Sequence, residues 1–152
     1  MSSDEQHDAP TPQITESGGK RVLHVDPVGA PIVGPEDTSD LVGNAWIENV
    51  ELIALPVSRL DPEFFRLASG QAGALLQKVV NYQLRLAVIG DISTHLAASG
   101  ALRDFVWESN RGEHIWFFAE VAELERKLEE RQAVLDAALA AQHRAATAGP
   151  LA

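Results

Sequence analysis

The sequence contains no cysteine, and this absence removes several kinds of chemistry at once. Disulfides, thiolate zinc sites, thiol catalysis and iron–sulfur ligation all need cysteine sulfur. Long apolar runs are absent too, because none approaches the roughly 20 residues that cross a bilayer. The acidic start, Met1 to Asp8, lacks the apolar stretch of a signal peptide. We therefore expect a cytoplasmic protein without a membrane partner.

Basic residues are few: Lys and Arg total 12 against 22 Asp and Glu, and the net charge is −10. Such a chain repels nucleic-acid phosphates and anionic membrane surfaces, so neither is an expected partner. The sequence has no Gly-x-Ser-x-Gly elbow, no His-Glu-x-x-His and no Gly-Lys-Ser/Thr phosphate loop. We predict no catalytic residue, no cofactor and no metal.

The composition that remains is typical of one globular domain, with 45% hydrophobic and 22% charged residues. Residues 1–20 are rich in polar residues, proline and glycine, and are predicted to be a disordered tail. Residues 21–128 are predicted to form a single α/β domain. Residues 129–152 are expected to be a C-terminal helical extension and tail.

Strand-like and helix-like segments alternate along this domain. Two β-rich runs, 22–25 and 30–33, flank Asp26-Pro27-Val28-Gly29 and predict a hairpin. Strands are then expected at 50–56, at 84–90 as the central strand, and at 115–118. This order predicts a mixed, mainly parallel sheet of four or five strands, with helices packed on it and a long C-terminal helix.

Helix starts are predicted at Gly34-Pro35 and Asp61-Pro62, by proline in the first turn, and at Ser99, by its capping hydroxyl. Gly70 and Gly73 fall inside the second helix, where close packing of another backbone would offset their weak helix propensity. Gly112 is expected to end the third helix in a left-handed conformation. The first helix is expected to bury Leu41, Val42, Ala45 and Trp46.

Isolated polar side chains and one tryptophan gather between residues 77 and 111, around the end of the strand at 84–90. Because open α/β sheets bind ligands at the carboxyl ends of their strands, these residues are the candidate ligand- or partner-binding site. They are Gln77, Lys78, Asn81, Asp91, Ser93, Trp107, Glu108, Asn110 and Arg111.

Each candidate also has a structural interpretation. Asp91 fits a turn or cap, Lys78 complements a helix dipole, and Asn110 fits a backbone cap. Glu108 and Arg111 fit an exposed ion pair at i, i+3, and Trp107 fits either an interface anchor or edge packing. Only convergence of these side chains on one place would favour a site.

The C-terminal helix carries a leucine stripe at Leu124, Leu128, Leu135 and Leu139, interrupted by Arg131. Its first half is expected to dock on the sheet. Its alanine-rich end, residues 137–148, either frays or pairs with a second copy of the chain, which would give a homodimer.

Three stretches together resemble a known bacterial family, domain of unknown function 4180. They are Phe64-Phe65-x-Leu67-x-x-Gly70-x-Ala72-Gly73-x-x-x-Gln77-Lys78-x-x-Asn81-Tyr82, then residues 86–91, Leu-Ala-Val-Ile-Gly-Asp, and then Leu102-x-Asp104-Phe105-x-x-Glu108-Ser109-Asn110-x-Gly112. The family pattern has a Glu after its Ala-Gly pair, whereas this chain has Ala74. The resemblance covers about residues 21–128 and implies no known activity.

The order of elements is similar to that of STAS domains; in the antagonist members of that fold, a serine at the helix start after a strand is phosphorylated. Asp61 stands at that helix start here and Ser58 lies three residues earlier, so the serine switch is not supported. The leading hypothesis is a non-enzymatic regulatory or interaction domain that binds a protein or small ligand at the strand C-terminal edge. The alternative is a small-molecule-binding or hydrolytic domain with a site around Asp91, Asn110 and Arg111.

Overall fold

The computed structural model describes residues 13–147, which begin with a β-hairpin. Strand β1 (Gln13–Ser17) pairs antiparallel with β2 (Lys20–His24). The two turn residues, Gly18 and Gly19, have φ values of +54° and +77°, which suit a tight hairpin turn.

The hairpin predicted at 22–25 and 30–33 is therefore wrong, and so is the disorder expected from residue 13 onward. The two-glycine turn sets the pairing, while residues 30–33 contribute only a bridge from Ile32 to Leu60. Residues 1–12 of the expected tail lie outside the described residues.

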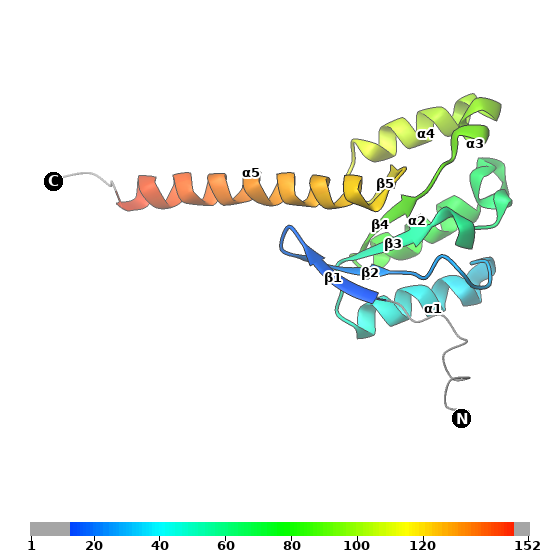
Figure 1. The fold of residues 1–152 in the computed structure, drawn as a ribbon, viewed down its shortest axis with the longest axis horizontal. Coiled ribbons are helices and arrows are strands. Elements are labelled where there is room, and N and C mark those ends of the chain that lie inside the picture. Colours follow the sequence, from blue (N-terminus) through cyan, green and yellow to red (C-terminus); the bar gives the residue numbers. More distant parts are fainter. Residues whose placement is uncertain (1–12, 148–152) are drawn as a thin grey trace.

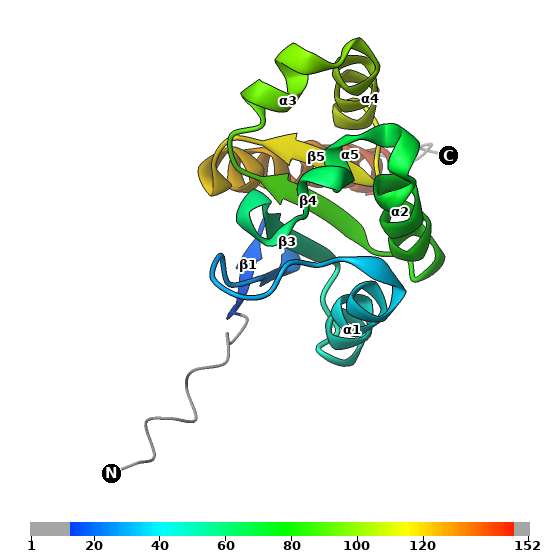
Figure 2. The ribbon, with the colours of Figure 1, turned by 90° about the vertical axis from the view of Figure 1, so that its right-hand side faces the viewer.

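Five strands form one mixed sheet in the order β1-β2-β3-β4-β5 (Figure 2). From β2 onward, β3 (Leu52–Pro56), β4 (Arg85–Ile89) and β5 (Ile115–Phe118) pair in parallel. The predicted α/β class and mainly parallel sheet are confirmed. The segment at 84–90 is not central, however, because β3 occupies the middle and β4 lies next to the edge strand β5.

Helices make the crossovers between the parallel strands. They are α1 (Gly34–Ile47), α2 (Gln71–Asn81), the short α3 (Ser93–Ala98) and α4 (Gly100–Asn110). Three single 3-10 turns, η2 (Val57–Arg59), η3 (Pro62–Phe65) and η4 (Leu67–Ser69), lead from β3 to α2. The long α5 (Val121–Thr147) follows β5.

The second helix begins later than predicted. Asp61 caps as expected, accepting a hydrogen bond from the Glu63 N–H, but the turn that it starts is η3. Gly70 has a φ of +83°, which ends the preceding helical turn, and α2 begins at the next residue. A Cβ at Gly70 or Gly73 would meet nothing within 4 Å, so the backbone packing predicted there is wrong.

The ends of α4 show one prediction confirmed and one wrong. The Ser99 hydroxyl caps the helix by accepting from the Leu102 N–H at 3.1 Å. Gly112 does not adopt a left-handed conformation, because α4 ends at Arg111 in an ordinary right-handed turn. The short α3 was not predicted.

The sheet is covered on its two faces by different helices (Figure 1). On one face, α1, α2 and α4 bury apolar residues against Leu23, Ile53, Leu55 and Leu86. On the other, among residues 13–147, α5 covers the strands, and its length carries it well beyond the sheet. In α1, Leu41, Val42 and Ala45 are buried as predicted, but Trp46 is 66% exposed because it lies beyond the packed stripe.

Candidate functional site

The residues predicted to form one site lie at two opposite ends of the sheet, some where the parallel strands end and others where they begin. Asp91 and Ser93 follow the carboxyl end of β4, whereas Asn81 ends the helix that leads into β4, and Arg111 follows the helix that leads into β5. The two ends of a five-residue strand are roughly 15 Å apart. The structure therefore does not bring Asp91 and Arg111 together.

At the carboxyl end of β4, Asp91 forms a local turn. Its exposed carboxylate accepts a hydrogen bond from the Ser93 N–H at 2.9 Å. This bond favours the charged form and holds the pKa of Asp91 below its usual value. The arrangement orders the start of α3.

Asn110 closes the open edge of the sheet. Its side-chain oxygen accepts from the Phe117 N–H at 2.7 Å, and its side-chain nitrogen donates to the Phe117 carbonyl at 3.3 Å. The amide thus replaces a missing neighbour strand beside β5. Both polar atoms of the Asn110 side chain therefore bond the backbone of β5.

The remaining candidates lie on helices. Arg111 lies over the Trp107 ring at 4.3 Å, and no ion pair joins it to Glu108. Trp107 itself is 59% exposed. Lys78 donates to the Ser39 hydroxyl of α1 at 2.9 Å, while Gln77 and Asn81 are exposed.

Two pockets do occupy the carboxyl edge, but they are built from other loops. One, of about 280 Å³, lies between α1 and the loop after β2, and Asp26, Asp40 and Arg59 line it. The second, of about 270 Å³, lies between α1 and α2, with an apolar floor that includes Leu60 and Phe64 and with Lys78 in its lining. Neither is lined by Asp91, Asn110 or Arg111.

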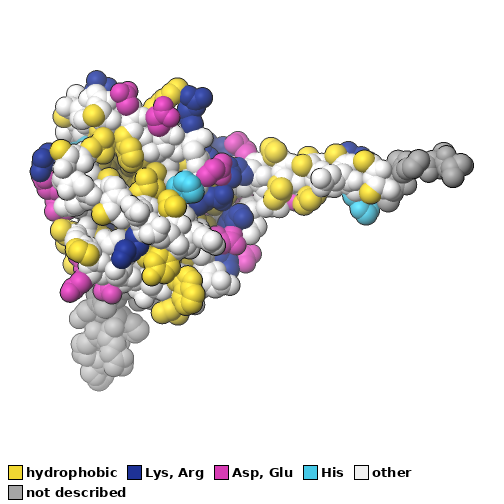
Figure 3. Space-filling view, turned by 180° about the vertical axis from the view of Figure 1, so that it is seen from behind, with side chains coloured by type: hydrophobic (Ala, Val, Ile, Leu, Met, Phe, Trp, Pro, Cys, Tyr) yellow, Lys and Arg dark blue, Asp and Glu magenta, His cyan; other side chains and the backbone are white. Residues whose placement is uncertain are grey.

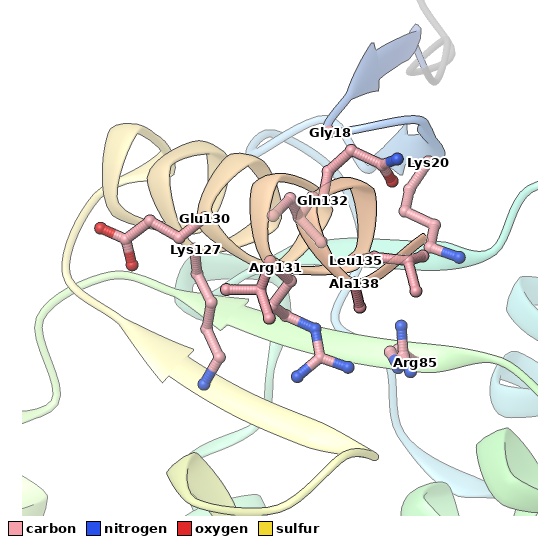
Figure 4. A pocket seen from close by; sticks show the side chains of 11 residues that line it. Gly18, Lys20, Arg85, Lys127, Glu130, Arg131, Gln132, Leu135 and Ala138 are labelled. Carbon is pink, nitrogen blue, oxygen red and sulfur yellow. The ribbon is translucent and has the colours of Figure 1, made fainter. Parts of the chain in front are cut away.

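A larger concave surface, about 620 Å³, lies at the opposite edge, where α5 leaves the sheet. We call it the basic corner; its lining combines four cations with apolar side chains of α5. The lining includes Lys20, Arg85, Lys127, Arg131, Leu128, Val134, Leu135 and Ala138. In Figure 4, Lys127 and Arg131 reach from α5 towards the strands, and Arg85 of β4 lies beside the Arg131 guanidinium.

Trp116 on β5 forms the floor beneath three of these cations. Lys127 Nζ lies 4.3 Å from the ring centroid, and the guanidinium carbons of Arg131 and Arg85 lie 5.4 and 5.8 Å from it. The indole is fully buried and donates to the Gly112 carbonyl at 2.9 Å. Cations over an indole face are attracted by its negative π-surface. The indole therefore helps to hold α5 on the sheet.

Glu113 completes this attachment. Its carboxylate accepts hydrogen bonds from both Nη atoms of Arg131 and from Arg85 Nη2 at 3.1 Å. The Arg131 bond is the largest cause that lowers the pKa of Glu113.

Burial, followed by the charge of Arg131, lowers the pKa of Lys127, whose Nζ donates to the Asn110 carbonyl at 2.9 Å. Lys127 and Arg131, together with Arg85 through their shared carboxylate Glu113, thus fix the first half of α5 on the sheet.

The second half of α5 lies beyond this attachment. Leu124 and Leu128 are 0% and 2% exposed, whereas Val134, Leu135 and Leu139 are 71%, 50% and 54% exposed. In Figure 3 hydrophobic side chains line the projecting helix. We call residues 133–147 the projecting half; its three large apolar side chains remain half exposed or more.

Residues 17–128 match the protein family described as Domain of unknown function (DUF4180), and the chain belongs to that family. The match ends at the last buried leucine of α5, so the projecting half lies outside it. No curated protein and no solved structure matches the chain. The similarity to STAS domains therefore stays a prediction.

Two further observations concern residues 13–147 alone. No helix among them is long and apolar enough to cross a membrane. Nor do they hold three or more His, Asp or Glu side chains placed to share a metal ion.

Sequence reasoning missed the basic corner because its parts are distant in the chain. Lys20, Arg85 and Arg131 come from two strands and a helix. One signal was available: cations are scarce in this acidic chain, and two lie one helical turn apart, at Lys127 and Arg131, before an unpaired leucine stripe.

Proposed function

We propose that this chain is a protein-interaction domain whose docking surface is the projecting half of α5 together with the basic corner. The observation that carries this proposal is the exposure of Val134, Leu135 and Leu139 on a helix whose first half is anchored. Exposed apolar side chains that lie together on one helix commonly mark a surface that binds another molecule.

The rest of the domain supports this function by presenting the helix. The Trp116 floor and the Glu113 network hold the root of α5, so the projecting half leaves the sheet in a set direction. The proposal keeps the interaction role inferred from the sequence but moves its surface from the carboxyl edge of the strands to the opposite edge. The alternative site around Asp91, Asn110 and Arg111 gains no support, because these side chains do not converge.

Site-specific photo-cross-linking tests the proposal. A photoreactive residue at Leu139 reports on the apolar face. One at Ala137 reports on the opposite face, because positions two residues apart in a helix point about 200° away from one another. In cells that naturally express the chain, we expect protein adducts at position 139 and few at 137. Equal labelling at both positions, or none at either, would contradict a docking surface on this face.

A further inference from the structure

The projecting half of α5 poses a physical problem that a partner solves. It has about four turns, and although the anchored half already supplies the helix nucleus, most helical stability in proteins comes from packing of an apolar face, which these turns lack in residues 13–147. Alanine is abundant here, which favours the helix, but Leu135 and Leu139 gain nothing from exposure. A partner that covers them would stabilise the helix and bury the stripe together.

We infer that the partner is a second copy of this chain, whose α5 lies antiparallel along the first and fills its basic corner. This inference rests on the proposed function and names its partner. The apolar wall of the corner, Val134, Leu135 and Ala138, belongs to the same helix that would fill the corner of the other copy. Because α5 both lines its own corner and would occupy the corner of the other copy, the contact is two-fold and uses the same helix surface on both chains.

The length of the helix sets the register. If the last turn, ending at Thr147, reaches the corner at Arg131, the two helices overlap over residues 131–147, or about 25 Å at 1.5 Å per residue. The middle of that overlap is Leu139, which would meet the partner's Leu139 near the two-fold axis. Ala138, beside it on the corner side, is small enough to let the helix backbones approach.

Charge favours the same orientation. The last carbonyls of a helix lack intrahelical partners and carry the negative end of its dipole. An antiparallel pair delivers this end to the corner, where Lys20, Arg85, Lys127 and Arg131 outnumber the lining carboxylate Glu130. The last turn also carries Arg144, but its position is about 180° around the helix from Leu135, so it lies on the side away from the contact. Glu113 and Glu51 neutralise part of this charge through their pairs with Arg131, Arg85 and Lys20. A parallel pair would instead place the two negative helix ends together, away from the cations.

The contact is short compared with standard interfaces, which bury ~800 Å² per partner. We therefore expect a dimer that dissociates on dilution.

Sedimentation equilibrium of the purified full chain, from micromolar to several hundred micromolar, tests the inference. The mass should rise from 16.4 kDa towards twice that value. Leu139→Glu places two like charges near the axis and should weaken dimerisation at least tenfold. The matched control, Ala137→Glu on the opposite face, should leave it unchanged. A wild-type monomer throughout, or equal dimerisation by all three chains, would overturn the inference.

Because the chain has no cysteine, single-cysteine variants report the orientation directly. Ala138 and Ala145 lie two turns apart on the same side of α5, seven residues from one another. In the antiparallel pair, Ala138→Cys should form a disulfide-linked dimer on mild oxidation and Ala145→Cys should not. Parallel helices in register would bring both positions next to their counterparts, so cross-linking of both variants, or of Ala145→Cys alone, would reject this geometry.

The two proposals fail in different ways. If the purified chain stays monomeric while the photoreactive residue at position 139 labels another protein, the second-copy inference is wrong and the interaction function stands. If neither dimer nor adduct forms, both are wrong.

Discussion

The two halves of α5 share one helix and one leucine stripe, yet they differ in what covers them. Leu124 and Leu128 are buried against Val22, Ala87 and Trp116, whereas Leu135 and Leu139 are about half exposed. The difference arises from the sheet, which ends beneath the first half. A periodic apolar stripe therefore predicts that a helix has a buried face, but it does not say which molecule buries it.

The comparison predicts its largest effect in the buried core of the anchored half. Leu124→Ala should lower the free energy of unfolding by about 2–5 kcal/mol, because it leaves a cavity at a fully buried site. Leu135→Ala, the matched change in the projecting half, should cost less than about 0.5 kcal/mol in dilute solution, where we expect a monomer. Urea unfolding measures both. Similar losses in both variants would contradict the division of α5 into two halves.

The next largest loss of stability is expected at the hairpin turn, which packs against the anchored half of α5. A Cβ at Gly18 would lie 2.2 Å from the Leu128 carbonyl oxygen, and the φ of +54° disfavours alanine. Gly18→Ala should therefore destabilise the domain by about 2–3 kcal/mol.

Gly34→Ala provides the control, since its φ is +78° but a Cβ there would meet nothing within 4 Å. We expect about 1 kcal/mol from the backbone alone. If the two variants unfold at the same urea concentration, the turn does not pack on α5 as described.

A smaller effect is expected for the carboxylate that fixes the root of α5. Glu113→Gln should cost at most about 1 kcal/mol at pH 7, because the carboxylate is 53% exposed and such pairs are screened. The exposed Glu129→Gln on α5 is the control and should change little.

The pH dependence of this effect follows from the sign of the shift. The pKa of Glu113 is lowered in the folded protein, so its contribution is present above its unfolded pKa, near pH 4, and is lost as the pH falls through the folded value. The difference between wild type and Glu113→Gln should shrink in strong acid. A difference that grows below pH 4 would contradict the assignment.

The smallest effect comes from His24 on β2. Burial lowers its pKa despite the opposing charge of Glu125 on α5, so protonation disfavours the folded state. Stability should therefore decline as the pH falls from about 6.5 through the folded pKa. His24→Gln, which cannot titrate, should reduce the decline in thermal midpoint between pH 7.5 and 5.5. Identical profiles for both chains would exclude His24 as a cause.

The fold was largely predictable because its signals are local. Ser99 caps α4 by accepting from the Leu102 N–H three residues later, and Asp61 caps η3 in a similar way. Residues 115–118 form the expected strand. The composition of residues 1–20 predicts a disordered tail, and this hides the hairpin turn that Gly18-Gly19 makes. The positive φ at Gly70, which delays α2, has no comparably clear local signal.

The candidate site was less predictable because residues that are close in the sequence need not be close in the folded chain. Each crossover helix runs opposite to the strands, so Asn81 and Arg111, at the ends of α2 and α4, return to the edge where strands begin, while Asp91 stays where β4 ends. The basic corner needs contacts between Gly18, Arg85 and α5 that no local pattern encodes.

Amide hydrogen exchange along α5, followed at several protein concentrations, tests the central claim most directly. Protection of residues 121–132 should not depend on concentration, because their own sheet covers them. Protection of residues 133–147 should be weak in dilute solution and increase as the chain concentration rises. Equal, concentration-independent protection along the whole helix, or a projecting half unprotected at every concentration, would contradict the account.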